Sequence, residues 1–258
     1  MLVEDNIMKK VLITGMSGLI GGILRRHLDT VGGYELTALN RRPVEGVRTV
    51  QASIADLDAI RPAFEGQDVV VNLAAHVASE PMVDVVQGNL VGTWNVYEAA
   101  RLAGVKRVVF ASSGDTIRGV DNDPPYNNIL KGDYEAASRW EWPKVTKELV
   151  RPGTIYGASK VWGEALGRVY SADHGLSILC VRIGHCPEEN RPIGSRAFAA
   201  WLSHRDVADM LQRCIDAPDN LLYDIFFAVS NNKWNYRDIE HAKQVLGYVP
   251  QDSAEDYR

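Results

Sequence analysis

Tyr156 and Lys160, four positions apart, are the two residues of this sequence best suited to move a proton. They lie in a stretch that opens with Pro152 and Gly153 and continues with small and apolar residues at helical spacing. This pattern predicts a helix, on which residues four apart share a face. A phenol has a pKa of about 10, and a neighbouring ammonium lowers it, so the pair could act as a general acid and base. Such a pair often occurs by chance, so its meaning depends on the elements that position it.

A glycine-rich turn near the N-terminus is the second stretch with chemical meaning. Residues 9–15 read as a buried strand, and Gly15, Gly18 and Gly21 then open a helix that runs to about Val31. Glycines at such a turn let the backbone approach a pyrophosphate, which binds at the positive end of the helix. Because the turn lies between a strand and a helix, it predicts dinucleotide binding and not merely a structural turn.

The end of the next strand bears on the choice of cofactor. The strand from Tyr34 to Leu39 is followed by Asn40, Arg41 and Arg42. An acidic residue at this place would accept the ribose hydroxyls of NAD, whereas arginine accommodates the 2′-phosphate of NADP. The sequence therefore favours NADP and leaves NAD open. The alternative is that the two arginines form only a solvated loop pair.

The rest of the chain continues to alternate strands with helices. Further strands are expected at 47–52, 69–75, 107–113, 176–183 and 223–229, and helices at 87–103, 201–217 and 239–246. This order predicts an α/β fold, a doubly wound parallel sheet whose ligands bind beyond the carboxyl ends of the strands. We expect one domain over 1–258. Its nucleotide-binding core spans 9–183, and a small C-terminal substrate-binding part spans 184–258.

The segment from Gly119 to Arg151 interrupts this alternation. It contains Trp140 and Trp142 and shows little regular periodicity. Its length and its place before Tyr156 fit an inserted lid or substrate loop. The alternative is a contact segment for a partner, in which the tryptophans simply pack.

Composition excludes several classes of function. The chain has 258 residues, 46% of them apolar and 24% charged, and a net charge of −5. Interspersed charges of this kind argue against nucleic acid or an anionic membrane as partner. We see neither an apolar run of membrane-spanning length nor the core of a signal peptide. Cys180, Cys186 and Cys214 are odd in number and lack metal-ligand spacing, so we predict free thiols in a reducing cytoplasm and no metal.

Taken together, the motifs resemble one enzyme superfamily. Gly15-x-x-Gly18-x-x-Gly21, Asn72-x-Ala-Ala75, Ser113 and Tyr156-x-x-x-Lys160 follow in the order typical of the extended short-chain dehydrogenases/reductases, the NAD-dependent epimerase/dehydratase superfamily. The stretches 110–117, 181–186, 196–204 and 246–255 resemble the uronate dehydrogenase-like sugar dehydrogenases. The resemblance implies a Rossmann-type fold and a homodimer formed through two long helices.

The resemblance also implies roles for individual residues. Tyr156 would transfer the proton, Lys160 would hold the nicotinamide ribose and lower the pKa of the tyrosine, and Ser113 would orient the reacting oxygen. The implied cofactor contacts are Gly15, Ser17, Gly18, Leu19, Ile20, Gly21, Asn40, Arg41, Arg42, Ser53, Ile54, Leu73, Ala74, Ala75, Asn89, Ala111, Tyr156, Lys160 and Ile183. The implied substrate contacts are His76, Val77, Ser113, Asp115, Gly184, His185, Arg191 and Arg196.

Among the substrate contacts, Arg196 matches an arginine that grips a uronate carboxylate, for which a guanidinium fork is well suited. The sequence departs from the uronate enzymes in several places. Val77 replaces a serine, Asp115 replaces a histidine, and Ser53 replaces the aspartate that holds the adenine ring. A neutral sugar or a sugar phosphate therefore stays open as the substrate.

The resulting hypothesis is an NAD(P)-dependent oxidoreductase that oxidises a sugar or a sugar acid of the uronate type. Three alternatives stay open. They are a sugar-nucleotide epimerase or dehydratase on the same fold, a sugar-phosphate dehydrogenase, and a non-catalytic protein that senses the cofactor. Intact Ser113, Tyr156 and Lys160 argue against the last of these.

Overall fold

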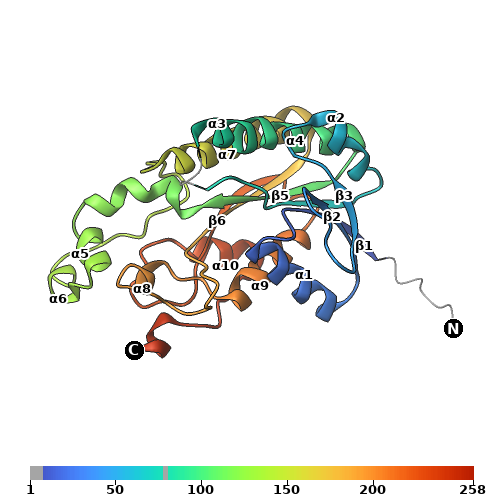
Figure 1. The fold of residues 1–258 in the computed structure, drawn as a ribbon. Helices are drawn as coiled ribbons and strands as arrows, with labels where there is room; N and C mark the ends of the chain where they lie inside the picture. The colour runs from blue at the N-terminus through green and yellow to red at the C-terminus, as the bar shows by residue number, and fades with distance from the viewer. Residues whose placement is uncertain (1–7, 78–80) are drawn as a thin grey trace.

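The computed structural model describes residues 8–77 and 81–258. In this part of the chain seven parallel strands form one sheet in the order β3-β2-β1-β4-β5-β6-β7 (Figure 1). The strands are β1 (Lys9–Thr14), β2 (Tyr34–Asn40), β3 (Arg48–Gln51), β4 (Val69–Asn72), β5 (Arg107–Ser113), β6 (Ser177–Ile183) and β7 (Tyr223–Ala228). The order reverses direction between β1 and β4, as expected for a doubly wound sheet. The predicted fold class is confirmed.

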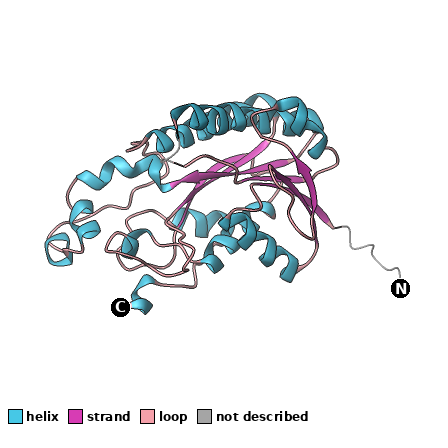
Figure 2. Ribbon diagram, viewed as in Figure 1, coloured by secondary structure: helices cyan, strands magenta, loops and turns pink. Residues whose placement is uncertain are grey.

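Helices cover both faces of the sheet (Figure 2). The α-helices are α1 (Leu19–Val31), α2 (Leu57–Ile60), α3 (Met82–Val85), α4 (Gly92–Ala103), α5 (Tyr126–Lys131), α6 (Tyr134–Ala137), α7 (Ile155–His174), α8 (Ala197–Ala200), α9 (His204–Ile215) and α10 (Glu240–Leu246). The other helical segments are η1 (Arg61–Ala63), η2 (Val86–Val91), η3 (Gly114–Asn122) and η4 (Ala254–Tyr257). Helices α2, α4 and α7 lie over one face, and α1, α9 and α10 lie over the other (Figure 1).

Alternation along each strand supplies one apolar core to each face. On β1, Val11 and Ile13 belong to the core under α1 and α9, whereas Leu12 belongs to the core under α4 and α7. Side chains of a strand alternate between faces, and a parallel sheet covered on both sides needs apolar residues at both sets of positions. This explains the nearly continuous apolar runs in the sequence.

Most element boundaries lie close to the predicted ones, and the predicted helix over 87–103 is present. Its first part is η2, a π-helical segment, and the regular α-helix α4 begins at Gly92. Two glycines permit close packing along this stretch. A β-carbon at Gly88 would lie 2.3 Å from the His76 ring, and one at Gly92 would lie 2.7 Å from Ile54.

The segment 119–151 is more regular than the sequence suggests. It contains α5 and α6, and its aromatic residues pack against the C-terminal part of the same chain. Trp234 stacks on Tyr134 with ring centroids 4.3 Å apart and on Trp142 at 6.1 Å. Trp142 is therefore a packing residue, while Trp140 is exposed. None of the helices in the described ranges combines the length and the apolar character that crossing a bilayer requires.

Candidate active site

The candidate site lies where the central strands end. In register, Thr14 at the end of β1 faces Asn72 of β4, and Ser113 of β5 faces Ile183 of β6. Two cavities of about 590 and 390 Å³ open at this edge of the sheet. They share Gly15, Gly18, Leu73 and Ala75 in their walls, so they form one continuous cleft.

Close backbone contacts build the wall of the first cavity. Gly15 has φ +69°, and a β-carbon there would lie 3.0 Å from the amide nitrogen of Ala74. A β-carbon at Gly21 would lie 2.6 Å from the carbonyl oxygen of Gly15. Only glycine fits these two positions, because one needs a left-handed conformation and the other touches backbone. Gly18 precedes α1 and offers no side-chain cap, so the N-terminus of the helix suits a pyrophosphate.

A buried polar pair holds the loop after β4 against this turn. The Thr14 hydroxyl donates to Asn72 Oδ1 at 2.7 Å and accepts from the amides of Leu73 and Ala74, each at 3.1 Å. These bonds explain why β4 stops at Asn72 although the predicted strand continues to Ala75. The loop backbone turns away from the sheet to bond Thr14, and it then lines the cleft.

Nearly all of the predicted cofactor contacts line the two cavities. The first cavity includes Gly15, Ser17, Gly18, Asn40, Arg41, Arg42, Ser53, Ile54, Leu73, Ala74 and Ala75. The second includes Gly15, Gly18, Leu19, Ile20, Gly21, Leu73, Ala75, Ala111, Tyr156, Lys160 and Ile183. At the end of β2, Asn40 is buried, while Arg41 and Arg42 are exposed at the rim. The cleft thus has the glycine turn and the helix terminus that a nicotinamide dinucleotide requires.

Asn89 is the exception, and its contact with the cofactor stays a prediction. Its side chain is buried and lines neither cavity. Asn89 Oδ1 accepts from the His76 amide at 2.7 Å, and Nδ2 donates to the His76 carbonyl oxygen at 2.9 Å. Nδ2 also lies 3.0 Å from Ser159 Oγ. Asn89 therefore fixes the loop after β4 to α7 and positions His76, which does line the cleft.

The predicted catalytic residues meet at the second cavity. Ser113 ends β5, and Tyr156 and Lys160 lie on the first turns of α7, whose start is capped by Thr154. Lys160 is buried and donates to the Ala111 carbonyl oxygen at 2.7 Å. Its ammonium lies 5.5 Å from the Tyr156 ring centroid. The structure thus brings the three side chains together, as the motif order predicts.

The pKa of Tyr156 differs from the sequence-based expectation. Burial, and then the charge of Asp115, raise it to about 12, while hydrogen bonding with Ser113 lowers it. Lys160 was expected to lower it, but burial reduces the pKa of Lys160 itself to about 8. Burial thus acts in opposite directions on the two pKa values, because it disfavours the charged form of each group and so raises the pKa of the phenol and lowers that of the ammonium.

A buried ion pair behind the catalytic residues was not predicted from the sequence. Arg182 of β6 is bidentate to Glu164 of α7, with both nitrogen–oxygen distances 2.8 Å, and Ser112 donates to the same carboxylate at 2.6 Å. Arg182 also donates to the Leu149 carbonyl oxygen at 3.1 Å. The pair joins β5, β6 and α7 directly beneath Ser113 and Lys160. Its only signal in the sequence is the position of Glu164 one helical turn after Lys160.

Only some of the predicted substrate contacts line the two cavities, in contrast to the predicted cofactor contacts. Val77 and Gly184 line the second cavity, and His76 lines the first. Arg191 is exposed and lines neither cavity, so its contact with the substrate stays a prediction. His185 also lies outside both cavities. Burial and then the charge of Arg196 lower the pKa of His185.

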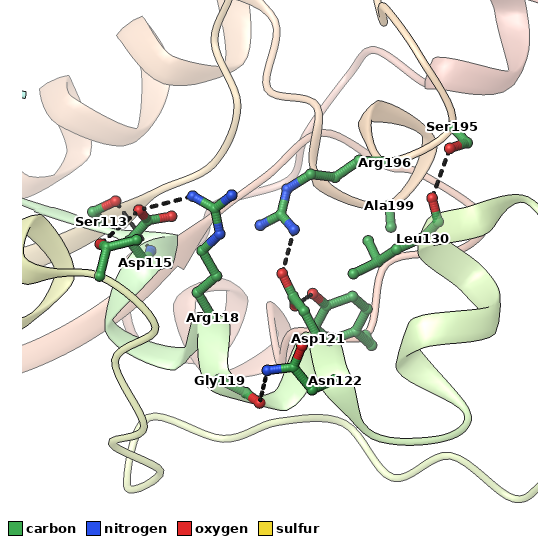
Figure 3. A network of polar contacts seen from close by, with 12 residues as sticks. Ser113, Asp115, Arg118, Gly119, Asp121, Asn122, Leu130, Ser195, Arg196 and Ala199 are labelled. Atoms are coloured by element: carbon green, nitrogen blue, oxygen red, sulfur yellow. Dashed lines mark hydrogen bonds and ion pairs between the residues drawn. The ribbon is translucent and has the colours of Figure 1, made fainter. Parts of the chain in front are cut away.

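Asp115 and Arg196 belong to a network of charged side chains beside the catalytic residues (Figure 3). Asp115 accepts from the Thr154 hydroxyl at 3.2 Å and forms an ion pair with Arg118 at 3.3 Å. Arg196 forms an ion pair with Asp121, whose other oxygen accepts from the Tyr236 hydroxyl at 2.6 Å. Arg118, Asp121 and Tyr236 were not predicted. For Arg118 a signal existed, since it follows Asp115 by three residues.

The glycine turn lies at the carboxyl end of the first strand of a parallel sheet, and a serine, a tyrosine and a lysine meet in the adjoining cavity. This combination is typical of nucleotide-dependent oxidoreductases and their isomerase relatives. The family model described as the NAD dependent epimerase/dehydratase family matches residues 11–205. The chain belongs to this family, the extended short-chain dehydrogenases/reductases, and the resemblance stated from the motifs is confirmed.

Individual relatives of the chain are sugar dehydrogenases by name. The chain is 33% identical to an L-arabinose 1-dehydrogenase (NAD(P)(+)) of Haloferax volcanii, over 96% of this chain and 98% of the relative. It is 31% identical to an NAD-dependent glucose-6-phosphate dehydrogenase of the same organism, over 96% and 95%. The crystal structure of uronate dehydrogenase from Agrobacterium tumefaciens superposes with a TM-score of 0.80 at 30% identity, covering 98% of this chain and 88% of that one.

Proposed function

We propose that the protein is an NAD(P)-dependent dehydrogenase that oxidises a hydroxyl of a sugar or a sugar derivative. The observation that carries this proposal is the convergence of Ser113, Tyr156 and Lys160 on a cavity continuous with the glycine-rich cofactor cleft. The relatives named above support it, because each is described as a dehydrogenase of a sugar, a sugar acid or a sugar phosphate.

In this proposal Tyr156 is the base that takes the proton of the substrate hydroxyl. Ser113 donates a hydrogen bond to the same oxygen and orients the carbon that is oxidised. A bound nicotinamide dinucleotide supplies the hydride acceptor. Lys160 stays fixed by the Ala111 carbonyl group and would hold the nicotinamide ribose. Because the pKa of Tyr156 is raised to about 12, little phenolate exists at neutral pH, and oxidation should accelerate as the pH rises.

For the cofactor we propose NADP, with NAD as the alternative. Arg41 and Arg42 are exposed at the rim of the first cavity, where a 2′-phosphate would add two negative charges. Asn40 cannot repel that phosphate as an aspartate would. Ser53 likewise contributes no negative charge to this end of the cleft.

The test is reduced-cofactor formation, measured in parallel with NADP and NAD. The substrates are glucuronate, galacturonate, their neutral parent sugars and the sugar 6-phosphates. We expect oxidation of at least one of them that depends on Tyr156. Binding of both cofactors without oxidation of any sugar, or epimerisation of a sugar nucleotide with no net reduction, would contradict the proposal.

We further propose that the protein is a homodimer formed through α4 and α7. These helices lie side by side on one face (Figure 1), and they expose Trp94, Trp162 and Val169. Exposed large apolar side chains grouped on one face are typical of a protein interface. Light scattering should give twice the mass of one chain, and Trp162→Glu should shift it toward one chain. We also propose a reducing, cytoplasmic location, since Cys180, Cys186 and Cys214 are free thiols.

A further inference from the structure

We infer that Arg118 and Arg196 together bind the phosphate group of a phosphorylated sugar, in exchange for their present partners Asp115 and Asp121. The inference rests on the proposed function and deepens it, because it names the class of substrate. It also assigns a role to Arg118, a residue that neither the motifs nor the resemblance singled out.

The two arginines come from distant segments and meet beside the catalytic residues. Arg118 lies on η3, shortly after Ser113, and Arg196 precedes α8. In Figure 3 their guanidinium groups point toward each other, between Asp115 and Asp121. Asp115 interacts with both arginines. One of its carboxylate oxygens lies 3.3 Å from a guanidinium nitrogen of Arg118, and its negative charge also raises the pKa of Arg196. The same carboxylate acts on Tyr156, so this group lies next to the reacting centre.

Exposure distinguishes these arginines from one with a purely structural role. The side chains of Arg118 and Arg196 are 44% and 38% exposed, so part of each guanidinium remains open to a ligand. Arg182, by comparison, is fully buried and has both edges occupied by Glu164 and the Leu149 carbonyl group. Neither Arg118 nor Arg196 lines the two cavities, but the Asp115 carboxylate that pairs with Arg118 acts on Tyr156, so their accessible donors lie beside the catalytic residues.

A third arginine makes the region positively charged. Arg237 is 2% exposed, and no carboxylate of the described chain lies within ion-pair distance of it. It donates to the Tyr236 hydroxyl at 3.3 Å, and its Nε is buried without a partner among the described residues. Tyr236 in turn bonds Asp121. A β-carbon at Gly114 would lie only 3.7 Å from Arg237 Nε, so this charge sits directly behind the turn after Ser113.

The number of donors favours a phosphate over a carboxylate. One guanidinium fork satisfies the two oxygens of a carboxylate, whereas a phosphate monoester presents three oxygens and up to two negative charges. The guanidinium groups of Arg118 and Arg196, together with the buried positive charge of Arg237, therefore suit a phosphate better than a carboxylate. A carboxylate substrate would leave Arg118 on Asp115 with no part in binding.

The test compares kcat/KM for a sugar 6-phosphate, the corresponding uronate and the neutral parent sugar. The wild type should prefer the phosphate over both by about 10-fold or more, since hydrogen bonds to charged groups contribute this much. Arg118→Ala should lower kcat/KM for the phosphate about 10- to 100-fold, and at least ten times more than for the neutral sugar. Arg118→Lys should restore part of the loss. Arg139→Ala, which removes an exposed arginine of the inserted segment, is the matched control.

Three results would overturn the inference. They are a preference for the uronate, equal turnover of phosphate and parent sugar, and equal losses on both in Arg118→Ala. Inorganic phosphate provides a test without turnover. It should raise the melting temperature of the wild type and of Arg139→Ala but not that of Arg118→Ala. If the cofactor binds and no sugar is oxidised, the proposed function fails, and the phosphate titration alone then decides whether the anion site exists.

Discussion

The two halves of the cleft are built in different ways. On the cofactor side the walls are backbone, and the decisive contacts are those of Gly15 and Gly21 with neighbouring carbonyl and amide groups. Beside the substrate side stand charged side chains held in ion pairs, among them Asp115, Arg118 and Arg196, none of which lines the two cavities. A backbone wall tolerates almost no change of shape, whereas a network of ion pairs can exchange one anion for another.

This difference has a consequence for chemistry. Asp115 acts on the pKa of Tyr156, while the glycine turn contributes no charged side chain to the cleft. The substrate side therefore tunes the proton transfer as well as the choice of substrate. The cofactor side is expected to affect binding and stability instead.

The largest effect should come from Tyr156→Phe, which removes the proposed base and retains the ring. We expect kcat to fall about 100- to 10,000-fold, the range that general base catalysis contributes. Cofactor affinity should change much less than kcat, because most of the cleft's cofactor side is formed by the glycine turn and the neighbouring loops. Tyr257→Phe at the exposed C-terminus is the matched control. Unaltered turnover in Tyr156→Phe would remove the tyrosine from the mechanism.

The next largest effect should come from a methyl group added to the cofactor wall. Gly21→Ala places a β-carbon 2.6 Å from the Gly15 carbonyl oxygen, so the turn must shift. We expect a loss of about 1–3 kcal/mol in the free energy of unfolding, as for other overpacked sites, and weaker cofactor binding. Denaturant titration measures the free energy of unfolding, and fluorescence titration measures the affinity for the cofactor.

Gly22→Ala is the neighbouring control for that substitution. Its β-carbon would meet only the flexible end of Arg26, at 3.4 Å. Alanine in the helix interior should then stabilise by about 0.5–1 kcal/mol. Equal destabilisation by the two alanines would show that the close backbone contact at Gly21 is not what matters.

Asp115→Asn tests whether the substrate side tunes the base. The carboxylate opposes formation of the phenolate, so its removal should lower the pKa of Tyr156. The rise of kcat/KM with pH in the oxidation direction should therefore move to lower pH. Asp123→Asn, another aspartate of the same region paired with an arginine, should leave the profile in place. A profile that moves to higher pH in Asp115→Asn would contradict the assignment.

The smallest effect should come from the rim of the cofactor cleft. Arg41 and Arg42 are exposed, so each ion pair with a 2′-phosphate contributes about 0.2–1 kcal/mol. Replacing both with alanine should raise the KM for NADP about 2- to 20-fold and leave that for NAD unchanged. Arg48→Ala, at the opposite end of β3, is the control. Unchanged KM for NADP would favour the solvated loop pair.

The same contrast explains how much could be predicted from the sequence. The strands, the glycine turn and the Tyr156 helix are local patterns, in which apolar alternation and glycine spacing reflect direct geometric needs. The π-helical geometry at 86–91 has no such local pattern, and there Gly88 packs closely against His76 from another segment. The hydrogen bonds of Asn89 to the His76 backbone depend on the same long-range contact.

On the substrate side, pattern alone could not show which charges meet. Asp121 and Arg196 are 75 residues apart, and their contact depends on how α8 returns to the inserted segment. Even the pKa of Tyr156 could not be read from its spacing to Lys160. Burial of the phenol raises this pKa, whereas the spacing predicts a lower one.

The most direct test of the account follows the hydrogen of the substrate. A sugar that the protein oxidises, labelled with deuterium at the oxidised carbon, is incubated with NADP or NAD, and the reduced cofactor is analysed by mass spectrometry. We predict that the reduced cofactor carries the deuterium and that Tyr156→Phe suppresses its formation. Deuterium that returns to an epimerised sugar, with the cofactor unchanged, would contradict the dehydrogenase assignment.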